Sequence, residues 1–371
     1  DPTAKEIRGY DFASGIDYSK LIDSYATTGI QAANLFKAIQ EVERMLSWSL
    51  DDVEIPEDED EEFKDRKMRK RVRTTIFLGF TSNQISCGMR EVIKFLVQNK
   101  MVQVLCTPAG GIEEDFIKVM KPHLTGEFHY DGREMRGNGM NRIGNMVVPN
   151  DNYCEFEDFC GPLLRQMHDE QDEMVKRCSA SGEAFEFWTP STMIKRMGLE
   201  IAKKNEDGSH KFPRYEDSVF YWAAKNDIPV FSPALTDGSV GDMLYFYLFK
   251  HPGFVLDIAA DIKKLNDIAL KARKTGVLII GGGLIKHHIM NANLMRNGCD
   301  FAVYMTTATE HDASDSGASC GEALSWGKIR IDAKPVKIAA EASLYFPLLV
   351  AKSFARWFHD GLWQTRCGEE G

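Results

Sequence analysis

Short apolar runs alternate with longer amphipathic stretches along most of this chain. The runs typical of buried strands cover residues 74–80, 101–106, 228–233, 276–283 and 300–307. Two more strands are expected near the carboxyl end, over 328–333 and 334–343. Helical patterns separate most of the runs, for example over 81–97 and 257–274. Strands interleaved with helices of this length predict βαβ units and a parallel sheet, and therefore the α/β class.

One segment departs from this alternation. Residues 51–62 hold nine acids in twelve positions, and residues 64–73 follow with seven basic residues. Opposed charge blocks are typical of solvated chain, so we expect a charged mobile insertion at about 50–73, with a tether for a partner subunit as the alternative. Polar composition also predicts surface loops at about 170–187 and 204–217.

Composition narrows the class of protein. The chain of 371 residues is long enough for one large α/β unit, and we expect a single domain over 8–366. A net charge of -10 argues against a nucleic-acid partner. The eight cysteines include no CxxC pair and no cluster with histidine, so we expect neither a metal site nor a disulfide framework. The apolar runs are too short to span a bilayer, and the expected location is the cytoplasm, without a membrane partner.

Small and hydroxyl residues follow the carboxyl ends of several predicted strands, where ligands of parallel sheets bind. They are Thr81 to Asn83 with Ser86, Pro108 to Gly111, Gly281 to Gly283, and Thr306 to Ala308. Glycine lets backbone amides approach a pyrophosphate, and helix N-termini add a positive dipole. Each run taken alone is equally explained by a tight turn. Their repetition is compatible with a dinucleotide site of variant geometry, since neither G-x-G-x-x-G nor a Walker A sequence occurs.

Carboxylates occupy several of the same strand ends. They are Glu113, Glu114, Asp237, Asp242, Asp312, Asp315 and Glu322. Acids from different strand ends can converge on a polycation, each pairing with one ammonium group. Taken singly, each acid is more often a turn residue or a helix N-cap.

Two further side chains are candidates for chemistry. His287 lies at a predicted helix start and is either a locally bonded histidine or a proton shuttle near neutral pH. Lys328 follows Trp326-Gly327, and a lysine amine beside a desolvating aromatic ring can form a Schiff base. On local grounds alone, Lys328 is more often an ordinary charge at a strand edge.

Together these stretches resemble the deoxyhypusine synthase family. The matching segments run in family order from residue 8 to about 354, and they include FLGFTSNQIS (77–86), AGGIEED (109–115), FSPALTDGSVGDM (231–243), GGGLIKHHIMNANLMRNG (281–298) and SWGKIRIDA (325–333). The combination of KHHIMNANLMRNG with SWGKIR is the most specific. The resemblance implies a Rossmann-like parallel sheet with helices on both faces, which is a variant dinucleotide-binding fold, and assembly as a tetramer.

The resemblance also implies a reaction with NAD as cofactor and spermidine as substrate. NAD takes a hydride from spermidine, and Lys328 attacks the resulting imine, releases 1,3-diaminopropane and holds the 4-aminobutyl group. This group passes to one lysine of the precursor of eukaryotic translation factor 5A. The retained NADH then reduces the new imine to deoxyhypusine.

The family pattern assigns roles to individual positions. Lys328 and His287 are implied to be catalytic, His287 by proton transfer. The implied substrate-binding residues are Glu113, Glu114, Asp242, His287, Asp315, Glu322 and Trp326. The implied cofactor-binding residues are Ser82, Asn83, Ser86, Ala109, Gly110, Glu114, Asp237, Gly282, Thr307, Ala308, Asp312, Ser316, Ala340 and Glu341.

Three positions depart from the family pattern. Pro108 stands where threonine is expected and lacks a backbone donor, Glu341 stands where aspartate is expected, and Cys87 replaces a small hydroxyl residue. The departures leave open a second hypothesis, a subunit with weak activity alone that needs a paralogue to complete its NAD site, in a heterotetramer instead of a homotetramer. A sirtuin-like deacylase is a third hypothesis, and the lack of a CxxC pair for its usual zinc module counts against it.

Overall fold

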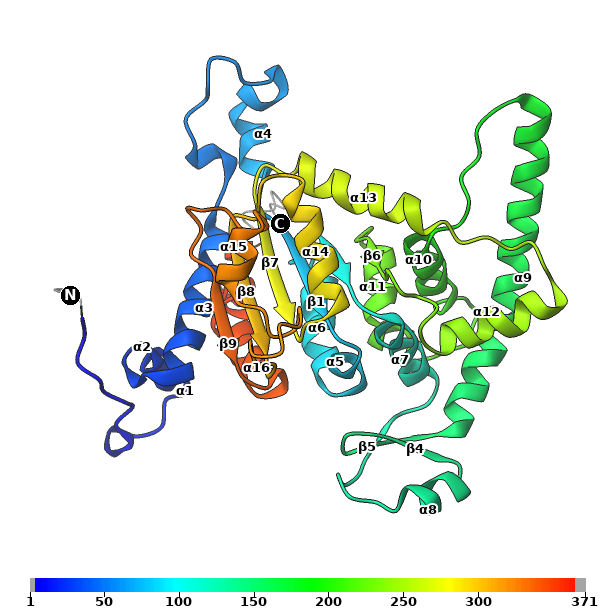
Figure 1. Cartoon of the computed structure of the whole chain (residues 1–371), viewed down its shortest axis with the longest axis horizontal. Coiled ribbons are helices and arrows are strands. Elements are labelled where there is room, and N and C mark those ends of the chain that lie inside the picture. The colour runs from blue at the N-terminus through cyan, green and yellow to red at the C-terminus, as the bar shows by residue number, and fades with distance from the viewer. Residues whose placement is uncertain (1–3, 364–371) are drawn as a thin grey trace. The chain divides into compact units, whose positions relative to one another are not determined.

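The computed structural model describes residues 4–363, so the last three residues of the predicted domain, 364–366, lie outside the described part. The chain divides into two compact units, one formed by residues up to 79 and from 266 onward, the other by residues 80–265. The stretch predicted from sequence as one domain therefore contains two packing units. Both contain parallel strands with helices around them, as Figure 1 shows, which confirms the α/β class.

The strands of the first unit carry the predicted parallel sheet. In spatial order they are β1 (Thr75–Phe80), β7 (Thr275–Ile280), β8 (Phe301–Thr306) and β9 (Val336–Ala339). The β7–β8 and β8–β9 pairs are parallel, with Val277 opposite Ala302 and Met305 opposite Ile338. All residues of β7 and β8 are buried, as expected for parallel strands that are covered on both faces.

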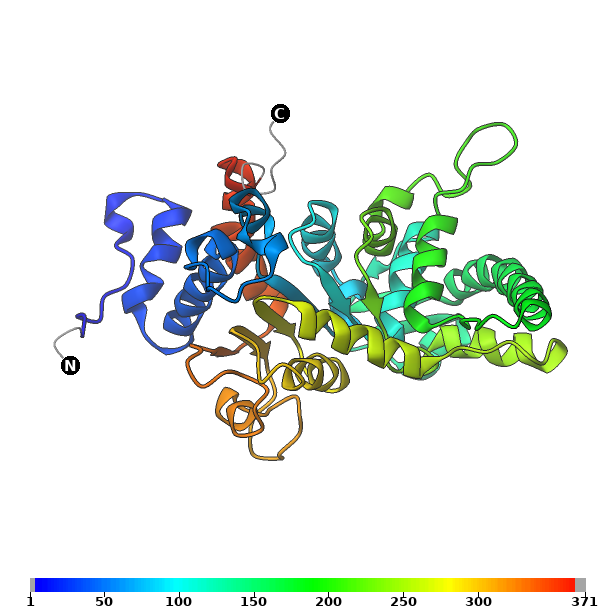
Figure 2. The ribbon, with the colours of Figure 1, turned by 90° about the horizontal axis from the view of Figure 1, so that it is seen from above.

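Helices cover both faces of these strands. Figure 2 shows on one face α3 (Ile30–Ser47) and α16 (Ala342–Lys352), and on the other α14 (Leu284–Leu294) and α15 (Cys320–Ser325). The other helical elements of this unit are η1 (Phe12–Ser14), α1 (Tyr18–Asp23), α2 (Tyr25–Thr28), η2 (Leu50–Asp52), η3 (Glu61–Lys64), α4 (Arg66–Arg71) and α17 (Phe354–His359). The helix α13 (Ile258–Lys271) contains the boundary between the units. None of the helices within residues 4–363 combines the length and the apolar composition that a membrane span requires.

The second unit has one parallel and one antiparallel group of strands. The short strands β2 (Val104–Cys106) and β6 (Val230–Phe231) pair in parallel. The antiparallel strands are β3 (Leu124–Thr125), β5 (Met146–Pro149) and β4 (Met140–Ile143), in that spatial order. The helical elements are α5 (Asn83–Ser86), α6 (Met89–Gln98), α7 (Ala109–Met120), α8 (Gly132–Gly137), α9 (Asn150–Ser181), α10 (Pro190–Glu200), η4 (Tyr215–Asp217), α11 (Val219–Lys225) and α12 (Ser239–Lys250).

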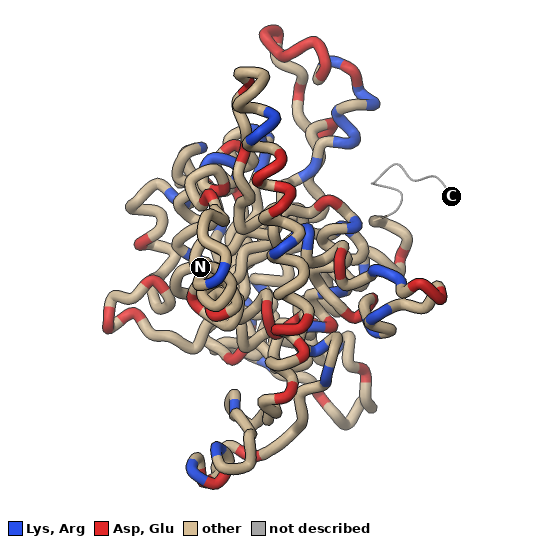
Figure 3. The backbone as a smooth tube through the Cα atoms, turned by 90° about the vertical axis from the view of Figure 1, so that its right-hand side faces the viewer, with Lys and Arg blue, Asp and Glu red and all other residues tan. Residues whose placement is uncertain are grey.

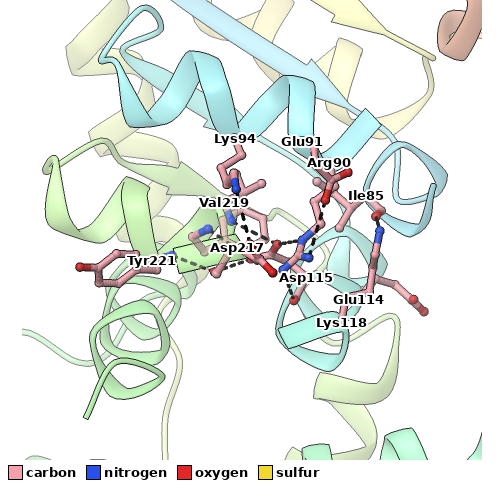
Figure 4. A network of polar contacts seen from close by, with 12 residues as sticks. Ile85, Arg90, Glu91, Lys94, Glu114, Asp115, Lys118, Asp217, Val219 and Tyr221 are labelled. Atoms are coloured by element: carbon pink, nitrogen blue, oxygen red, sulfur yellow. Dashed lines mark hydrogen bonds and ion pairs between the residues drawn. The ribbon is translucent and has the colours of Figure 1, made fainter. Parts of the chain in front are cut away.

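A buried carboxylate on α7 connects three helices of the second unit (Figure 4). Arg90 on α6 donates from Nε to Asp115 Oδ1 at 2.7 Å, and both side chains are almost completely buried. The same carboxylate accepts from Ser218 Oγ at 2.5 Å and from the Val219 amide at 3.1 Å, at the start of α11. Asp115 therefore binds the N-cap residue and a first-turn amide of one helix while it neutralises a cation on another.

The helix predicted over 81–97 is interrupted. It forms as α5 and α6, with extended backbone at Cys87 between them. Lys118 on α7 donates to the carbonyl oxygens of Ile85, Ser86 and Cys87, at 2.9, 3.1 and 3.1 Å. These carbonyls are the acceptors that a continuous helix would use, so the half-buried Lys118 side chain replaces the helical hydrogen bonds and ends α5.

The prediction of a surface loop at 170–187 is wrong for most of this segment. The helix α9 continues to Ser181 and ends where Gly182 adopts φ +72°. Buried residues recur along this helix as far as Cys178, including Gln171, which donates to the Gly253 carbonyl and accepts from the Val255 amide. The prediction failed because the polar composition of this segment belongs to a helix that is only half buried. Residues 204–217 do form a loop, which ends in η4.

The charged segment at 50–73 is not a structureless insertion. The Arg69 side chain on α4 is buried and donates to the carbonyl oxygens of Val53 and Phe63, at 2.7 and 3.0 Å. It also pairs with the Glu59 carboxylate at 3.1 Å. The acidic block therefore folds around one basic residue of the block that follows it. Figure 3 shows the remaining acidic and basic residues of the segment spread along its backbone.

We expect Asp115→Asn to lower the free energy of unfolding by about 3–5 kcal/mol, because Arg90 would remain buried without its counter-charge. Asp227→Asn is the matched control, since Asp227 pairs with Lys195 and both side chains are largely exposed. The control should lose about 1 kcal/mol or less. Equilibrium unfolding in urea measures both, and equal losses would contradict the role of Asp115.

Candidate active site

One pocket in the first unit contains most of the predicted catalytic and substrate-binding residues. It has a volume of about 300 Å³ and is formed by α14, the loop before α15, α15 and the turn after it. Its lining includes His287, Asp315, Glu322, Trp326 and Lys328. The structure therefore brings together residues that are up to 41 positions apart in the sequence, from His287 to Lys328.

The position of Lys328 follows from how α15 ends. Gly327 adopts φ +71°, and the Lys328 amide donates to the Ala323 carbonyl at 2.9 Å while the Gly327 amide donates to Leu324. This pair of bonds is a Schellman motif, in which glycine supplies the left-handed residue. The strand predicted over 328–333 does not form, because the chain turns here and makes only an isolated bridge between Ile329 and Cys299.

The aromatic ring of Trp326 lies beside the Lys328 side chain. The Lys328 Nζ atom is 5.9 Å from the centre of the indole ring. Trp326 is 65% exposed, so much of the ring remains available to another molecule. Asp315 and Glu322 are also exposed, and their carboxylates are free to pair with cations that enter the pocket.

His287 is held on α14 by a neighbour one turn further along. The Asn291 Nδ2 atom lies 3.2 Å from His287 Nδ1. Because an amide nitrogen can only donate, Nδ1 accepts this bond and the ring proton is left on Nε2. The imidazole is half buried in the pocket wall, which suits exchange of a proton with a bound molecule.

Lys286 is a pocket residue that the sequence analysis did not select. Its buried ammonium group donates to the carbonyl oxygens of Asp315 and Ala318, at 2.7 and 2.8 Å. Burial lowers the pKa of Lys286 to about 8, and the positive charge of Lys337 contributes. Lys286 thus fixes the loop that carries Asp315. Its place in the Lys-His-His sequence was visible, but no sequence signal distinguished it from an exposed lysine.

The predicted cofactor residues of the first unit lie at strand ends and helix starts. A Cβ atom on Gly282 would come within 2.4 Å of Ser316 Cα, so the two segments are in close contact. The Ala308 amide donates to Thr306 Oγ1, and the Ala340 amide donates to the Thr306 carbonyl. The remaining positions are Thr307, which is exposed, Asp312, which accepts from the Ser314 amide, and Glu341, which accepts from the Ser343 amide as the N-cap of α16.

The other predicted residues lie in the second unit. Ser82 packs against Gly110, where a Cβ atom would approach Ser82 Cβ to 2.8 Å. Ala109 is buried at the first position of α7. The remaining ones are Asn83 and Asp237, which are exposed, Ser86, which is buried on α5, and Asp242, which is exposed in the first turn of α12.

Glu113 has a structural partner. Its Oε2 atom accepts from the Val240 amide at 3.0 Å, in the first turn of α12. Burial raises the pKa of Glu113, and the amides of Val240 and Ser239 act in the opposite direction. The carboxylate therefore holds the helix that carries Asp242, which was not foreseen from the sequence.

Glu114 belongs to a buried polar cluster that the sequence analysis missed in part. Its Oε2 atom lies 3.0 Å from His123 Nε2, and its Oε1 atom accepts from the Tyr153 hydroxyl at 3.4 Å. Burial raises the pKa of Glu114 to about 7, and the charge of Glu113 contributes. Burial lowers the pKa of His123 to about 4. A lone histidine and a tyrosine at these positions gave no pattern in the sequence.

The helix starts after two buried strands fit the phosphates of a dinucleotide. α7 begins after β2 with Pro108 as its N-cap, and α14 begins after β7 with Gly283, φ +64°, as its N-cap. Neither N-cap side chain hydrogen-bonds its helix, so the first-turn amides have no cap. Such amides, with nearby hydroxyl groups, are donors that a phosphate group can use, so the residues present are compatible with the phosphates of a dinucleotide.

Comparisons with known proteins agree with the pattern in the sequence. A family model described as deoxyhypusine synthase matches residues 20–353. The chain is 52% identical over 353 residues to a Dictyostelium discoideum protein named "Probable deoxyhypusine synthase", with 95% of this chain and 87% of the relative covered. It is 51% identical over 355 residues to the deoxyhypusine synthase of Senecio vernalis, with 95% and 90% covered.

A solved structure shares the fold. It is described as a "putative deoxyhypusine synthase" from Entamoeba histolytica and aligns with a TM-score of 0.62 at 33% sequence identity. The alignment covers 94% of this chain and 97% of that chain. The similarity extends over both compact units.

The raised pKa of Glu114 predicts a dependence of stability on pH. In the folded protein the carboxyl binds its proton more tightly than in the unfolded chain, so the free energy of unfolding falls as the pH rises from about 4.5 to about 7. Glu114→Gln, which cannot ionise, should be more stable than the parent protein at about pH 8, by roughly 2–3 kcal/mol, and should lose this advantage near pH 4.

Urea unfolding at both pH values measures the difference. Glu127→Gln is the control, because Glu127 is exposed and its substitution should change stability equally at the two pH values. A Glu114→Gln effect that does not depend on pH would contradict the prediction.

Proposed function

This chain belongs to the deoxyhypusine synthase family, and we propose that it transfers the 4-aminobutyl group of spermidine, in an NAD-dependent reaction, to a lysine of the precursor of eukaryotic translation factor 5A. The observation that carries the proposal is the pocket in which Lys328 lies with Asp315, Glu322, Trp326 and His287. A primary amine, two carboxylates, an indole ring and an imidazole are the groups that amine transfer from a polycation requires.

Spermidine enters the pocket as a flexible polycation. Its ammonium groups pair with the exposed carboxylates of Asp315 and Glu322, which replaces part of their hydration. Its aliphatic stem lies on the exposed face of Trp326, where apolar contact and cation–π attraction both contribute. These contacts select a long diamine segment over a single ammonium ion.

Lys328 is the nucleophile. Bound NAD supplies the hydride acceptor for the oxidation of the substrate amine and returns the hydride at the end. The deprotonated Nζ of Lys328 attacks the carbon of the oxidised amine, the bond from that carbon to the secondary nitrogen breaks, and 1,3-diaminopropane leaves. The four-carbon group stays on Lys328 as an imine until the lysine of the acceptor protein displaces it.

Proton transfer accompanies each of these exchanges. The substrate amine must lose a proton before it is oxidised, and the departing amine must gain one. His287 presents Nε2 with its ring proton at the pocket wall, because Nδ1 accepts from Asn291. To accept a proton from a bound amine, His287 needs the other tautomer, with Nε2 unprotonated and with the Asn291 amide turned so that its oxygen accepts from Nδ1–H; the imidazolium that results can return the proton to the departing amine.

A second candidate function is a subunit that completes its NAD site only with a paralogous chain. The observation that favours it is Pro108, which stands directly before the first turn of α7 and brings no backbone N–H to the phosphate donors. Such a chain would assemble as a heterotetramer, whereas an active chain would form a homotetramer.

The test of the nucleophile is incubation with NAD and labelled spermidine, followed by borohydride reduction and peptide mapping. The label should appear on the peptide that contains Lys328 and should be lost in Lys328→Ala. Lys334→Ala is the control, since Lys334 is exposed in the same segment and does not line the pocket. Label that survives Lys328→Ala overturns the mechanism, and label that requires a co-expressed paralogue supports the second candidate.

Asp315→Asn tests the recognition of the polycation. Loss of one charge-assisted pair should raise KM for spermidine about 10- to 100-fold with a smaller effect on kcat. Asp332→Asn is the control, because Asp332 is exposed, pairs with Arg330 and lies outside the pocket lining. Steady-state kinetics at saturating NAD measures both variants, and an unchanged KM in Asp315→Asn would exclude Asp315 from substrate binding.

A further inference from the structure

Three large apolar side chains are exposed next to the pocket that contains Lys328. Trp326, which lines the pocket, is 65% exposed, Met295 is 52% exposed and Ile331 is 97% exposed. Met295 directly follows the pocket residue Leu294, and Ile331 lies three positions after Lys328. Met295, Trp326 and Ile331 together are called the apolar rim. A single exposed apolar side chain is ordinary, whereas three that border one pocket indicate an interaction site.

The turn that carries Ile331 is fixed to the end of α14. The Cys299 amide donates to the Lys328 carbonyl, and the Arg330 amide donates to the Cys299 carbonyl, both at 3.1 Å. Gly298 adopts φ +101°, and a Cβ atom at this position would come within 2.6 Å of the Arg330 nitrogen. The end of α14 and this turn are therefore packed closely together beside Lys328.

The charged neighbours of Ile331 are paired within the protein. The Ala333 amide donates to the Arg330 carbonyl at 3.1 Å, which closes a turn with Ile331 and Asp332 at its centre. Arg330 Nε donates to Asp332 Oδ1 at 3.0 Å and lies 3.6 Å from Asp300 Oδ1. Because these charges neutralise one another, the turn offers a partner mainly the apolar surface of Ile331.

A small substrate does not need this surface, but a protein substrate does. The lining of the pocket includes neither Met295 nor Ile331, so spermidine can be bound without them. The lysine of a protein acceptor must reach Lys328 while the rest of that protein stays outside. An interface of standard size buries about 800 Å² on each partner, which is a patch roughly 30 Å across. Three residues of chain reach at most about 11 Å, so Ile331 falls within such a patch centred on Lys328.

We propose that the apolar rim is the docking surface for the acceptor protein, and that Met295 and Ile331 serve only the second half of the reaction. The inference rests on the proposed function, which requires a protein lysine to displace the four-carbon group from Lys328. The matching surface of the partner, next to its lysine, is apolar. Tryptophan and methionine are enriched in protein interfaces, and a side chain on a fixed turn loses little freedom on binding.

The experiment measures the two halves of the reaction separately, in the full-length protein. The first half is followed with NAD and labelled spermidine alone, as the rate at which borohydride traps label on Lys328. The second half starts from the labelled protein and follows transfer to the precursor of eukaryotic translation factor 5A at increasing concentration of the precursor. The concentration that gives half of the maximal rate reports docking.

Transfer to a small amine separates docking from chemistry. When 1,3-diaminopropane is added to the labelled protein, its amine displaces Lys328 from the imine, and the retained NADH reduces the product to spermidine. This return reaction uses the same nucleophile and the same bonds as transfer to the acceptor protein. It needs no surface outside the pocket.

Ile331→Ser and Met295→Ser should each raise the half-saturating concentration of the acceptor protein about 10-fold, because each removes apolar surface that is buried only in the complex. Trapping on Lys328 and return of the label to 1,3-diaminopropane should not change. Ile331→Leu, which keeps the apolar surface, should behave like the unsubstituted protein. Ile30→Ser is the matched control, because Ile30 is 91% exposed and begins α3 on the other face of the sheet (Figure 2).

A half-saturating concentration that stays constant in both serine variants overturns the proposal. Slower trapping on Lys328 in these variants also overturns it, because the residues would then serve the pocket or the assembly. If the unsubstituted protein traps no label on Lys328 or transfers none to the precursor, with or without a paralogue, the proposed function itself has failed. That failure is visible before any variant is measured, so the two outcomes are distinguishable.

Discussion

Parallel strands that are buried on both faces constrain everything else in this protein. Each such strand is followed by a helix that returns the chain to the start of the next strand. Because both faces of the strand are buried, polar side chains gather at the junction between strand and helix. The β7 strand leads through Gly281 to Gly283 into α14, and β2 leads through Pro108 into α7. The uncapped helix starts, His287 and Glu113 all owe their positions to these two junctions.

Lysine and aspartate residues have either a structural or a ligand-binding role in this protein, and the role depends on how far the side chain is buried. Lys286 is buried and Lys118 is half buried, and the ammonium group of each donates to backbone carbonyls, so these lysines fix loops near the predicted ligand positions. Lys328 instead follows a glycine turn and lies beside an indole ring that is largely open. Asp115 is likewise committed to Arg90 and α11, whereas Asp315 is exposed in the pocket. Groups without internal partners are those left for a substrate.

Much of the site was predictable because it rests on local chemistry and on the spacing of short motifs. The pocket contains His287, Glu322 and Lys328 as the motif pattern implied. The structural duty of Glu113 was not predictable, since its partner, the Val240 amide, is 127 residues away. Lys286 and His123 escaped notice for a related reason. The role of a single lysine or histidine depends on the carbonyl or carboxyl group that the fold places next to it.

By itself, the sequence determined the α/β class and the family, because strand periodicity, glycine turns and motif order are local properties of the chain. It misjudged segments whose structure depends on a distant partner, such as the charged stretch folded around Arg69 and the helix divided by Lys118. Only the tertiary structure decided which charges are buried and which face a ligand. Burial is set by the whole fold, and burial is the main reason why the pKa of Glu114 is raised to about 7.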